Sequence, residues 1–78
     1  MIEVTYFGVL AEIARTRTEC VETSATTAGA LYDDLADRHR FSWPPDRIRL
    51  AVNEAIVNRA HPLRDGDRIM LLPPVSGG

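Results

Sequence analysis

The sequence contains no lysine, and all nine of its basic residues are arginines. A chain without lysine offers only its α-amino group as an amine acceptor, so it cannot build lysine-linked chains on itself. A GC-rich genome also favours arginine over lysine. The absence is therefore compatible with a protein whose own carboxyl end is activated, but it does not establish one.

Other features are scarce as well. The single cysteine cannot form an internal disulfide, which fits a reducing compartment. No apolar run approaches the roughly 20 residues that a membrane span needs, and the start "MIEVTYF" does not resemble a signal peptide. The 11 acidic and 9 basic residues are well mixed and give a net charge of −2, without a basic block for a phosphate backbone. We therefore expect a cytoplasmic protein that binds neither nucleic acid nor membrane.

Sequence motifs typical of catalytic sites are scarce too. The chain shows no glycine-rich phosphate loop and no serine or cysteine nucleophile with a recognisable base, so it is not expected to be an enzyme on its own. His39 and His61 are far apart in sequence and lack a metal-ligand arrangement, so no metal site is expected. Cys20 is expected to be a small packed residue of a strand rather than a sulfur relay.

Several segments of the chain alternate between residues expected to face the core and residues expected to face outward. Apolar residues with a period of two predict strands at Met1–Phe7 and in the segments 47–53 and 68–72. Shorter strands are expected in "TECVETS" (18–24), at an edge of the sheet, and in "AIV" (55–57). With 78 residues and 45% hydrophobic content, these segments belong to one small globular domain.

One segment has helical periodicity. Between Thr27 and His39 the apolar positions form one stripe, and Thr26 or Thr27 can cap the first turn. Pro44–Pro45 then forbids continuation, so "FSWPPD" is expected to be a loop whose two aromatic residues cover the core. A short helical turn is expected after Gly8. The order of elements predicts an α+β domain with one main helix across one face of a sheet.

The predicted last strand has a second, outward face. Its even-numbered residues Arg68, Met70 and Leu72 point away from the helix, and Phe7 has the matching parity on the first strand. If the two strands are neighbours, the apolar members of this set form an exposed group beside the C-terminal tail. A contiguous exposed apolar group favours a partner interface.

The tail itself, "PPVSGG", can be neither a helix nor a central strand. Two prolines favour an extended path, and six extended residues reach roughly 20 Å. Such an arm can carry the carboxylate of Gly78 into a narrow channel of another protein. The residues expected to enter that channel are Pro73, Pro74, Val75, Ser76 and Gly77.

A free carboxylate is unreactive as an electrophile, so chemistry at Gly78 requires activation. Adenylation by an ATP-using partner is the evident route. The acyl adenylate can then react with sulfide or persulfide sulfur to give a thiocarboxylate, or with a thiol to give a thioester. The chain would be the substrate or carrier in this reaction.

Four blocks carry a family resemblance: "VTYFGVLAEIA", "AVNEAIV", "HPLRDGDRI" and above all "PPVSGG" at the chain end. With them the chain resembles, over essentially its whole length, the ubiquitin-like sulfur-carrier family. That family includes the small subunit of molybdopterin synthase and the thiamine carrier, and "PPV" before the diglycine is typical of the former.

The resemblance implies a β-grasp fold with a domain at residues 1–72 and an extended tail at residues 73–78. It also implies adenylation of Gly78 by an ATP-dependent activating enzyme and conversion to a thiocarboxylate with a sulfur donor. The tail would then enter the large synthase subunit, in an expected heterotetramer, and deliver sulfur to the pterin precursor of molybdenum cofactor. The catalytic residues would lie in the large subunit, and no cofactor is expected on this chain.

Alternatives remain open from the sequence. The chain could carry sulfur for another pathway of the thiamine or cysteine type, or it could be a ubiquitin-like modifier conjugated through Gly78. A third reading is a binding module whose tail has no chemical role.

Overall fold

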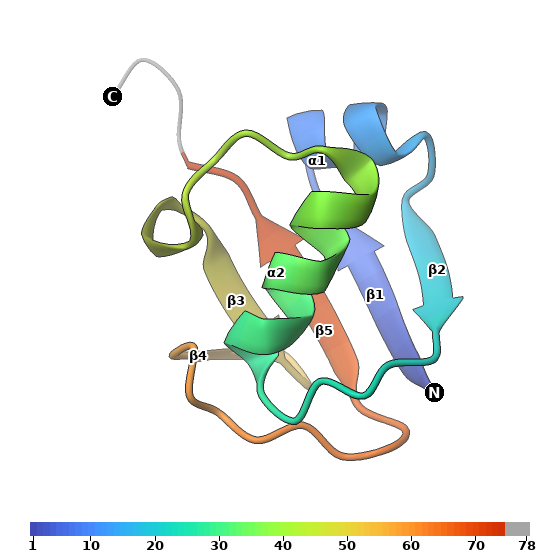
Figure 1. Ribbon diagram of the computed structural model, residues 1–78, viewed down its shortest axis with the longest axis vertical. Coiled ribbons are helices and arrows are strands. Elements are labelled where there is room, and N and C mark those ends of the chain that lie inside the picture. The colour runs from blue at the N-terminus through green and yellow to red at the C-terminus, as the bar shows by residue number, and fades with distance from the viewer. Residues whose placement is uncertain (75–78) are drawn as a thin grey trace.

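The chain folds as a sheet covered on one face by a helix (Figure 1), and the computed structural model describes residues 1–74. The elements in chain order are β1 (Ile2–Tyr6), α1 (Val9–Ala14), β2 (Thr18–Val21), α2 (Ala28–His39), η1 (Pro45–Arg47), β3 (Arg49–Val52), β4 (Ala55–Val57) and β5 (Arg68–Leu72). The predicted order of strands and the main helix are confirmed, with bounds that differ by a few residues at most. A short 3₁₀ turn, η1, was not predicted.

The sheet has the strand order β2-β1-β5-β3-β4. The neighbouring strands β1 and β5 are parallel, whereas the other pairs are antiparallel. A parallel pair requires a long crossover, and here that connection includes α2, which lies across the sheet (Figure 1). β2 lies at an edge, as predicted. This arrangement is the predicted β-grasp fold.

The core lies between α2 and the facing side of the sheet. Its fully buried large side chains come from β1, α1, α2 and β5, and they are Val4, Tyr6, Leu10, Leu31, Tyr32, Leu35, Ile69 and Leu71. Phe41 is buried with them, and Trp43 packs against the cluster, so the predicted covering role of this loop is confirmed. The Tyr32 hydroxyl donates to the Trp43 carbonyl oxygen at 2.9 Å, which fixes the loop to the helix.

Helix α2 begins and ends at identifiable signals. The Thr27 hydroxyl accepts a hydrogen bond from the Ala30 amide at 3.2 Å, so Thr27 is the N-cap. At the other end Arg40 adopts a left-handed conformation with φ of 61°. The αL residue ends the helix and turns the chain toward the loop that carries Phe41.

The segment between β4 and β5 is held against the first turn of α2. The Gly29 amide donates to the Arg59 carbonyl oxygen at 2.9 Å, and the Arg59 guanidinium pairs with Asp33 at 2.9 Å. A Cβ on Gly29 would lie 2.7 Å from the Arg59 Cβ, so only glycine allows this approach. The helix and the long connection are thereby packed as one unit.

Among residues 1–74 there is no helix long and apolar enough to span a membrane.

Candidate functional site

β5 and β1 are neighbours, as the sequence reasoning assumed. In their parallel register Arg68 lies beside Glu3 and Met70 beside Thr5. The Phe7 amide donates to the Leu71 carbonyl oxygen at 3.2 Å, which continues the pairing beyond β1. The outward residues of both strands therefore share one surface next to the point where the tail begins.

The four residues predicted for a partner interface are together on this outer face. Phe7 is 39% exposed, Met70 and Leu72 are half-buried, and Arg68 is exposed with its Nε 4.0 Å from a Glu3 carboxylate oxygen. Their inward neighbours Ile69 and Leu71 are fully buried. The alternation predicted for β5 is confirmed, whereas the binding role of the outward set stays a prediction.

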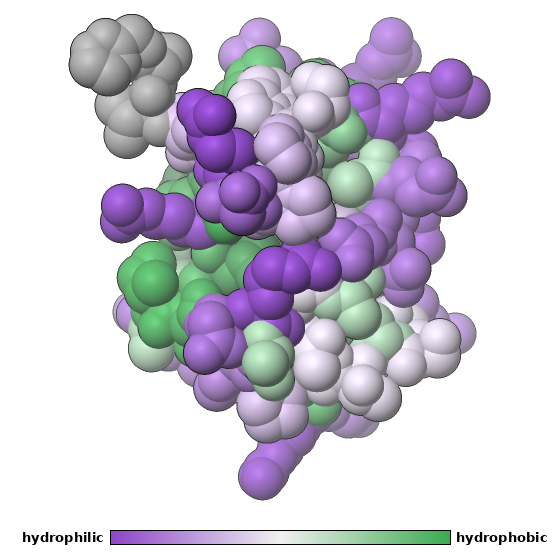
Figure 2. All heavy atoms as spheres, turned by 60° about the vertical axis from the view of Figure 1, so that its left-hand side comes forward, coloured by the Kyte–Doolittle hydropathy of each residue, from purple (hydrophilic) through white to green (hydrophobic). Residues whose placement is uncertain are grey.

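Two further residues extend this surface and were missed by sequence reasoning. Ala51, which is itself buried, lies opposite both Met70 on β5 and Ile56 on β4, and Ile56 is 63% exposed. We call Phe7, Ala51, Ile56, Met70 and Leu72 the outer apolar patch. Figure 2 shows hydrophobic side chains gathered on this side of the molecule beside strongly hydrophilic ones.

The two-residue turn between β3 and β4 is the sequence feature that could have placed Ile56 on the outer face. Asn53 and Glu54 have φ of 51° and 73°, the two positive values of a two-residue hairpin turn. Such a turn fixes the register of its strands, so it places Ile56 opposite Ala51. The place of Ile56 on the outer face was not predicted from the sequence.

The tail leaves the sheet at the end of β5, against the end of β1. Pro73 and Pro74 are half-buried, and the Pro73 Cγ lies 3.3 Å from where a Cβ on Gly8 would be. Gly8 also has a positive φ of 56°. A side chain at residue 8 would therefore be strained and would crowd the base of the tail.

The rest of the predicted tail site cannot be placed. Val75, Ser76, Gly77 and Gly78 lie outside the described residues. Their roles, and the boundary between domain and tail at residues 72 and 73, stay predictions.

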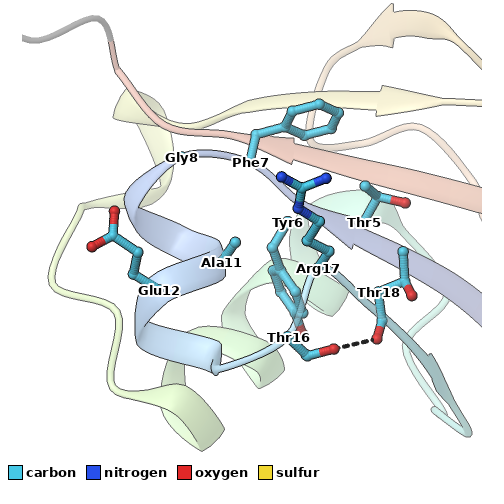
Figure 3. Close-up of a pocket in the computed structure, with 9 residues that line it drawn as sticks. All are labelled: Thr5, Tyr6, Phe7, Gly8, Ala11, Glu12, Thr16, Arg17 and Thr18. Atoms are coloured by element: carbon cyan, nitrogen blue, oxygen red, sulfur yellow. Dashed lines mark hydrogen bonds between the residues drawn. The ribbon is translucent and has the colours of Figure 1, made fainter.

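An open groove of about 720 Å³ lies on the β2 side of the tail base (Figure 3). Its lining comes from β1, α1 and the segment leading into β2, namely Thr5, Tyr6, Phe7, Gly8, Ala11, Glu12, Thr16, Arg17 and Thr18. The Thr16 hydroxyl donates to the Thr18 carbonyl oxygen at 2.7 Å, so this hydroxyl is engaged with the backbone. This lining provides polar and apolar contacts, but it does not pair a nucleophile with a base.

A second groove of about 610 Å³ lies on the β3 side of the tail base. It is lined by Asp46, Arg47, Arg49, Ile56, Leu72, Pro73 and Pro74. It shares Ile56 and Leu72 with the outer apolar patch. The base of the tail is therefore flanked by a groove on each side.

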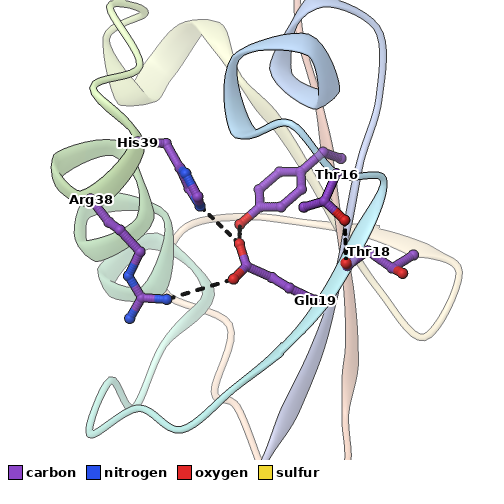
Figure 4. A network of polar contacts seen from close by, with 6 residues as sticks. Thr16, Thr18, Glu19, Arg38 and His39 are labelled. Atoms are coloured by element: carbon purple, nitrogen blue, oxygen red, sulfur yellow. Dashed lines mark hydrogen bonds and ion pairs between the residues drawn. The ribbon is translucent and has the colours of Figure 1, made fainter.

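A cluster of polar side chains connects β2 to α2 (Figure 4). The Glu19 carboxylate accepts hydrogen bonds from the Tyr6 hydroxyl and from His39 Nε2, the latter at 2.8 Å, and lies 3.7 Å from an Arg38 nitrogen. Burial alone would raise the pKa of the Glu19 carboxyl. The hydrogen bonds from Tyr6 and His39, with the charges of His39 and Arg38, outweigh burial and lower this pKa. Burial and Glu19 raise the pKa of Tyr6.

This cluster should make folding stability depend on acidity. The folded-state pKa of Glu19 lies below its ordinary value of 4.5, so its contribution is full above that value and is lost as pH falls through the folded pKa. We expect the urea midpoint of the wild type to fall more steeply between about pH 5 and pH 3 than that of Glu19→Gln. Parallel curves for the two proteins would show that Glu19 does not stabilise the fold.

The structure also places the two histidines and the cysteine that were considered as candidate sites in the sequence. His39 belongs to the cluster around Glu19, and the His61 carbonyl oxygen accepts from the Ala28 amide at 2.9 Å. Within residues 1–74 no group of three or more His, Cys, Asp or Glu residues is placed to hold a metal ion. The expectation that Cys20 is packed is wrong, because Cys20 lies opposite Glu3 on the outer side of the edge strand and is exposed.

Comparisons with known proteins agree with this fold. The chain matches the ThiS family over residues 4–78. It is 35% identical over 81 residues to the molybdopterin synthase sulfur carrier subunit of Escherichia coli, with 100% of both chains covered.

Two solved structures are also similar. The crystal structure of SAMP1, the small archaeal modifier protein 1 of Haloferax volcanii, has a TM-score of 0.78 and 31% identity and covers 99% of this chain and 98% of that one. The complex of subunits 1 and 2 of molybdopterin-converting factor from Helicobacter pylori contains a chain with a TM-score of 0.66 and 30% identity, covering 99% and 97%. Fold and sequence thus lead to the same assignment: the chain belongs to the ThiS family.

Proposed function

We propose that this protein is a sulfur carrier and the small subunit of a molybdopterin synthase. An activating enzyme joins the Gly78 carboxylate to AMP from ATP, with release of pyrophosphate. Sulfide displaces AMP and gives the Gly78 thiocarboxylate directly. A persulfide instead gives an acyl disulfide, which a thiol reductant cleaves to the same thiocarboxylate. A synthase subunit receives the tail and transfers this sulfur to a pterin precursor, and water supplies the oxygen that restores the Gly78 carboxylate.

One observation carries the proposal. The strand that leads into "PPVSGG" is a central strand of the sheet, with Leu71 fully buried on one face and Leu72 in the outer apolar patch on the other. The fold therefore offers a rigid origin for the tail beside a surface suited to a partner. The 35% identity to a sulfur carrier subunit over the whole chain supports the same function.

In this proposal the chain carries the sulfur, and partner proteins catalyse the chemical steps. Among the described residues that line the two grooves at the tail base, no hydrogen bond pairs a hydroxyl with a carboxylate, so the chemical steps are assigned to partners. The similarity to a chain in a complex of subunits 1 and 2 of molybdopterin-converting factor supports a large-subunit partner for this protein.

A mass measurement tests the sulfur step. The protein would be co-expressed with the activating enzyme and a sulfur source, and its intact mass determined. We expect a gain of about 16 Da, because sulfur replaces one terminal oxygen. An unchanged mass under conditions that load a known carrier would contradict the proposal.

A second function is favoured by one finding, the similarity to SAMP1. A protein modifier would also be adenylated at Gly78, but it would end as an isopeptide on lysine side chains of other proteins. In the same experiment a modifier would give high-mass adducts that resist thiols and are lost when Gly78 is absent. Their appearance in place of the sulfur-loaded mass would assign this function instead.

The outer apolar patch should be needed for binding the large subunit. We expect Ile56→Asp to raise the Kd at least about tenfold, because an exposed apolar contact is replaced by a charge that must be desolvated. Ile13→Asp is the matched control, since Ile13 is 38% exposed but lies on α1 outside the patch. Calorimetric titration would measure both. Equal losses in the two variants would show that the patch is not the interface.

A further inference from the structure

The groove on the β3 side of the tail base contains two arginines that are free to bind another molecule. Arg47 and Arg49 are both exposed. Among residues 1–74, no carboxylate lies within 4.0 Å of either guanidinium, whereas Arg38, Arg59 and Arg68 each have one. The two arginines are therefore not used within the described part of the fold.

Their position connects them to the proposed interface. Arg49 lies directly opposite Leu72 in the β3–β5 ladder, and Arg47 ends the 3₁₀ turn that precedes β3. The same groove is lined by Ile56, Leu72 and the two prolines of the tail base. An apolar lining thus adjoins two cations where a tail-binding protein must approach.

This combination suits carboxylates of a protein rather than nucleic acid. Arginine presents a planar fork of donors that binds a carboxylate in a bidentate manner, and it is enriched in protein interfaces. The groove is also lined by the acidic residue Asp46, and the whole chain carries a net charge of −2. Two arginines are therefore too few to bind a phosphate backbone. The prolines and Ile56 favour an occupant that also carries apolar groups.

We propose that this groove receives an acidic segment of the synthase subunit that accepts the tail. The proposal rests on the proposed function and adds the chemistry of the partner. Apolar contact at the patch is not directional, whereas ion pairs on one side of the tail base fix the orientation of the two proteins. The arginines therefore align the tail with the partner's channel.

Charge reversal tests this proposal in the full-length protein. In the double variant Arg47→Glu, Arg49→Glu we expect the Kd for the large subunit to rise at least about tenfold at low salt. We also expect the dependence of binding on salt to become weaker than in the wild type. The control is Arg64→Glu, which is compared with Arg49→Glu alone so that both variants change the net charge equally. Arg64 lies in the turn that leads into β5, where its carbonyl oxygen accepts from the Asp67 amide, at the end of that strand opposite the tail.

Arg49→Glu and Arg64→Glu form the strict pair, because each replaces one arginine with one glutamate. We expect Arg49→Glu to weaken binding several-fold and Arg64→Glu to leave it within about twofold. If reversal lowers the folded content seen by circular dichroism, the neutral variant Arg47→Gln, Arg49→Gln replaces it, with a smaller effect of the same sign.

The other outcomes would overturn the proposal. Equal weakening by Arg49→Glu and Arg64→Glu would show an effect of net charge alone, and unchanged binding in both would show that the groove is not used. Slower adenylation with unchanged large-subunit binding would assign the groove to the activating enzyme instead. Failure of the wild type to bind the large subunit would refute the proposed function itself, which separates that failure from failure of this inference.

Discussion

A chain that lacks Gly78 is expected to fold normally and to transfer no sulfur. One residue spans about 3.5 Å of extended chain, so the deletion would move the terminal carboxylate by up to that distance from the activating centre. A misplacement of about 1 Å can already cost a factor of about 100 in rate. Product formation by the truncated chain should therefore fall below the detection limit. Adenylate formation measured as pyrophosphate release, and product formation in a reconstituted synthase assay, would report it.

The fold should be unaffected because the buried residues of β5 end at Leu71. Thermal unfolding monitored by circular dichroism should therefore give the same Tm for the truncated chain and the wild type. A chain extended by one alanine beyond Gly78 is a second variant, which keeps all native residues but displaces the carboxylate the other way. Normal product from either chain would refute the assigned role of Gly78.

Two adjacent leucines should respond in opposite ways to the same substitution. Leu71 is fully buried, and Leu71→Ala should lower the free energy of unfolding by about 2–5 kcal/mol through lost contacts and the cavity left behind. That is a large part of the total for a small domain, which is typically about 5–15 kcal/mol. Leu72 lies on the outer face, and Leu72→Ala should cost less than about 1 kcal/mol but raise the Kd for the large subunit about tenfold.

Urea unfolding and calorimetric binding, applied to both variants, would measure this separation. Each variant is the control for the other, because the same substitution is made at two adjacent leucines of the same strand. Binding of Leu71→Ala should be close to that of the wild type at temperatures where it is folded. Equal destabilisation by the two substitutions would mean that β5 does not divide its residues between core and partner.

The sequence allowed the sheet and the main helix to be predicted because the signals are local. Alternation identified the two faces of β5, a cap at Thr26 or Thr27 was expected at the start of α2, and the proline pair after Trp43 excluded a longer helix. The identity of the tail site, in contrast, depended on family resemblance. Physical reasoning alone limited the tail to a carrier, a modifier or an incidental terminus.

The features that escaped prediction depend on contacts between segments distant in sequence. Glu19 meets His39 only because the edge strand lies beside the end of α2, and Gly29 is required only because Arg59 folds over it. Cys20 was expected to be packed, but one face of the edge strand is not covered by the helix. None of these arrangements has a signature in local periodicity.

The central place of β5 also bears on how the protein is made. A nascent chain that has not yet delivered residues 68–72 leaves β1 and β3 without the neighbour that they share, so the sheet cannot close during most of translation. Gly78, the proposed acyl site, follows β5 in the sequence, so a chain that has delivered Gly78 has already delivered every strand of the sheet.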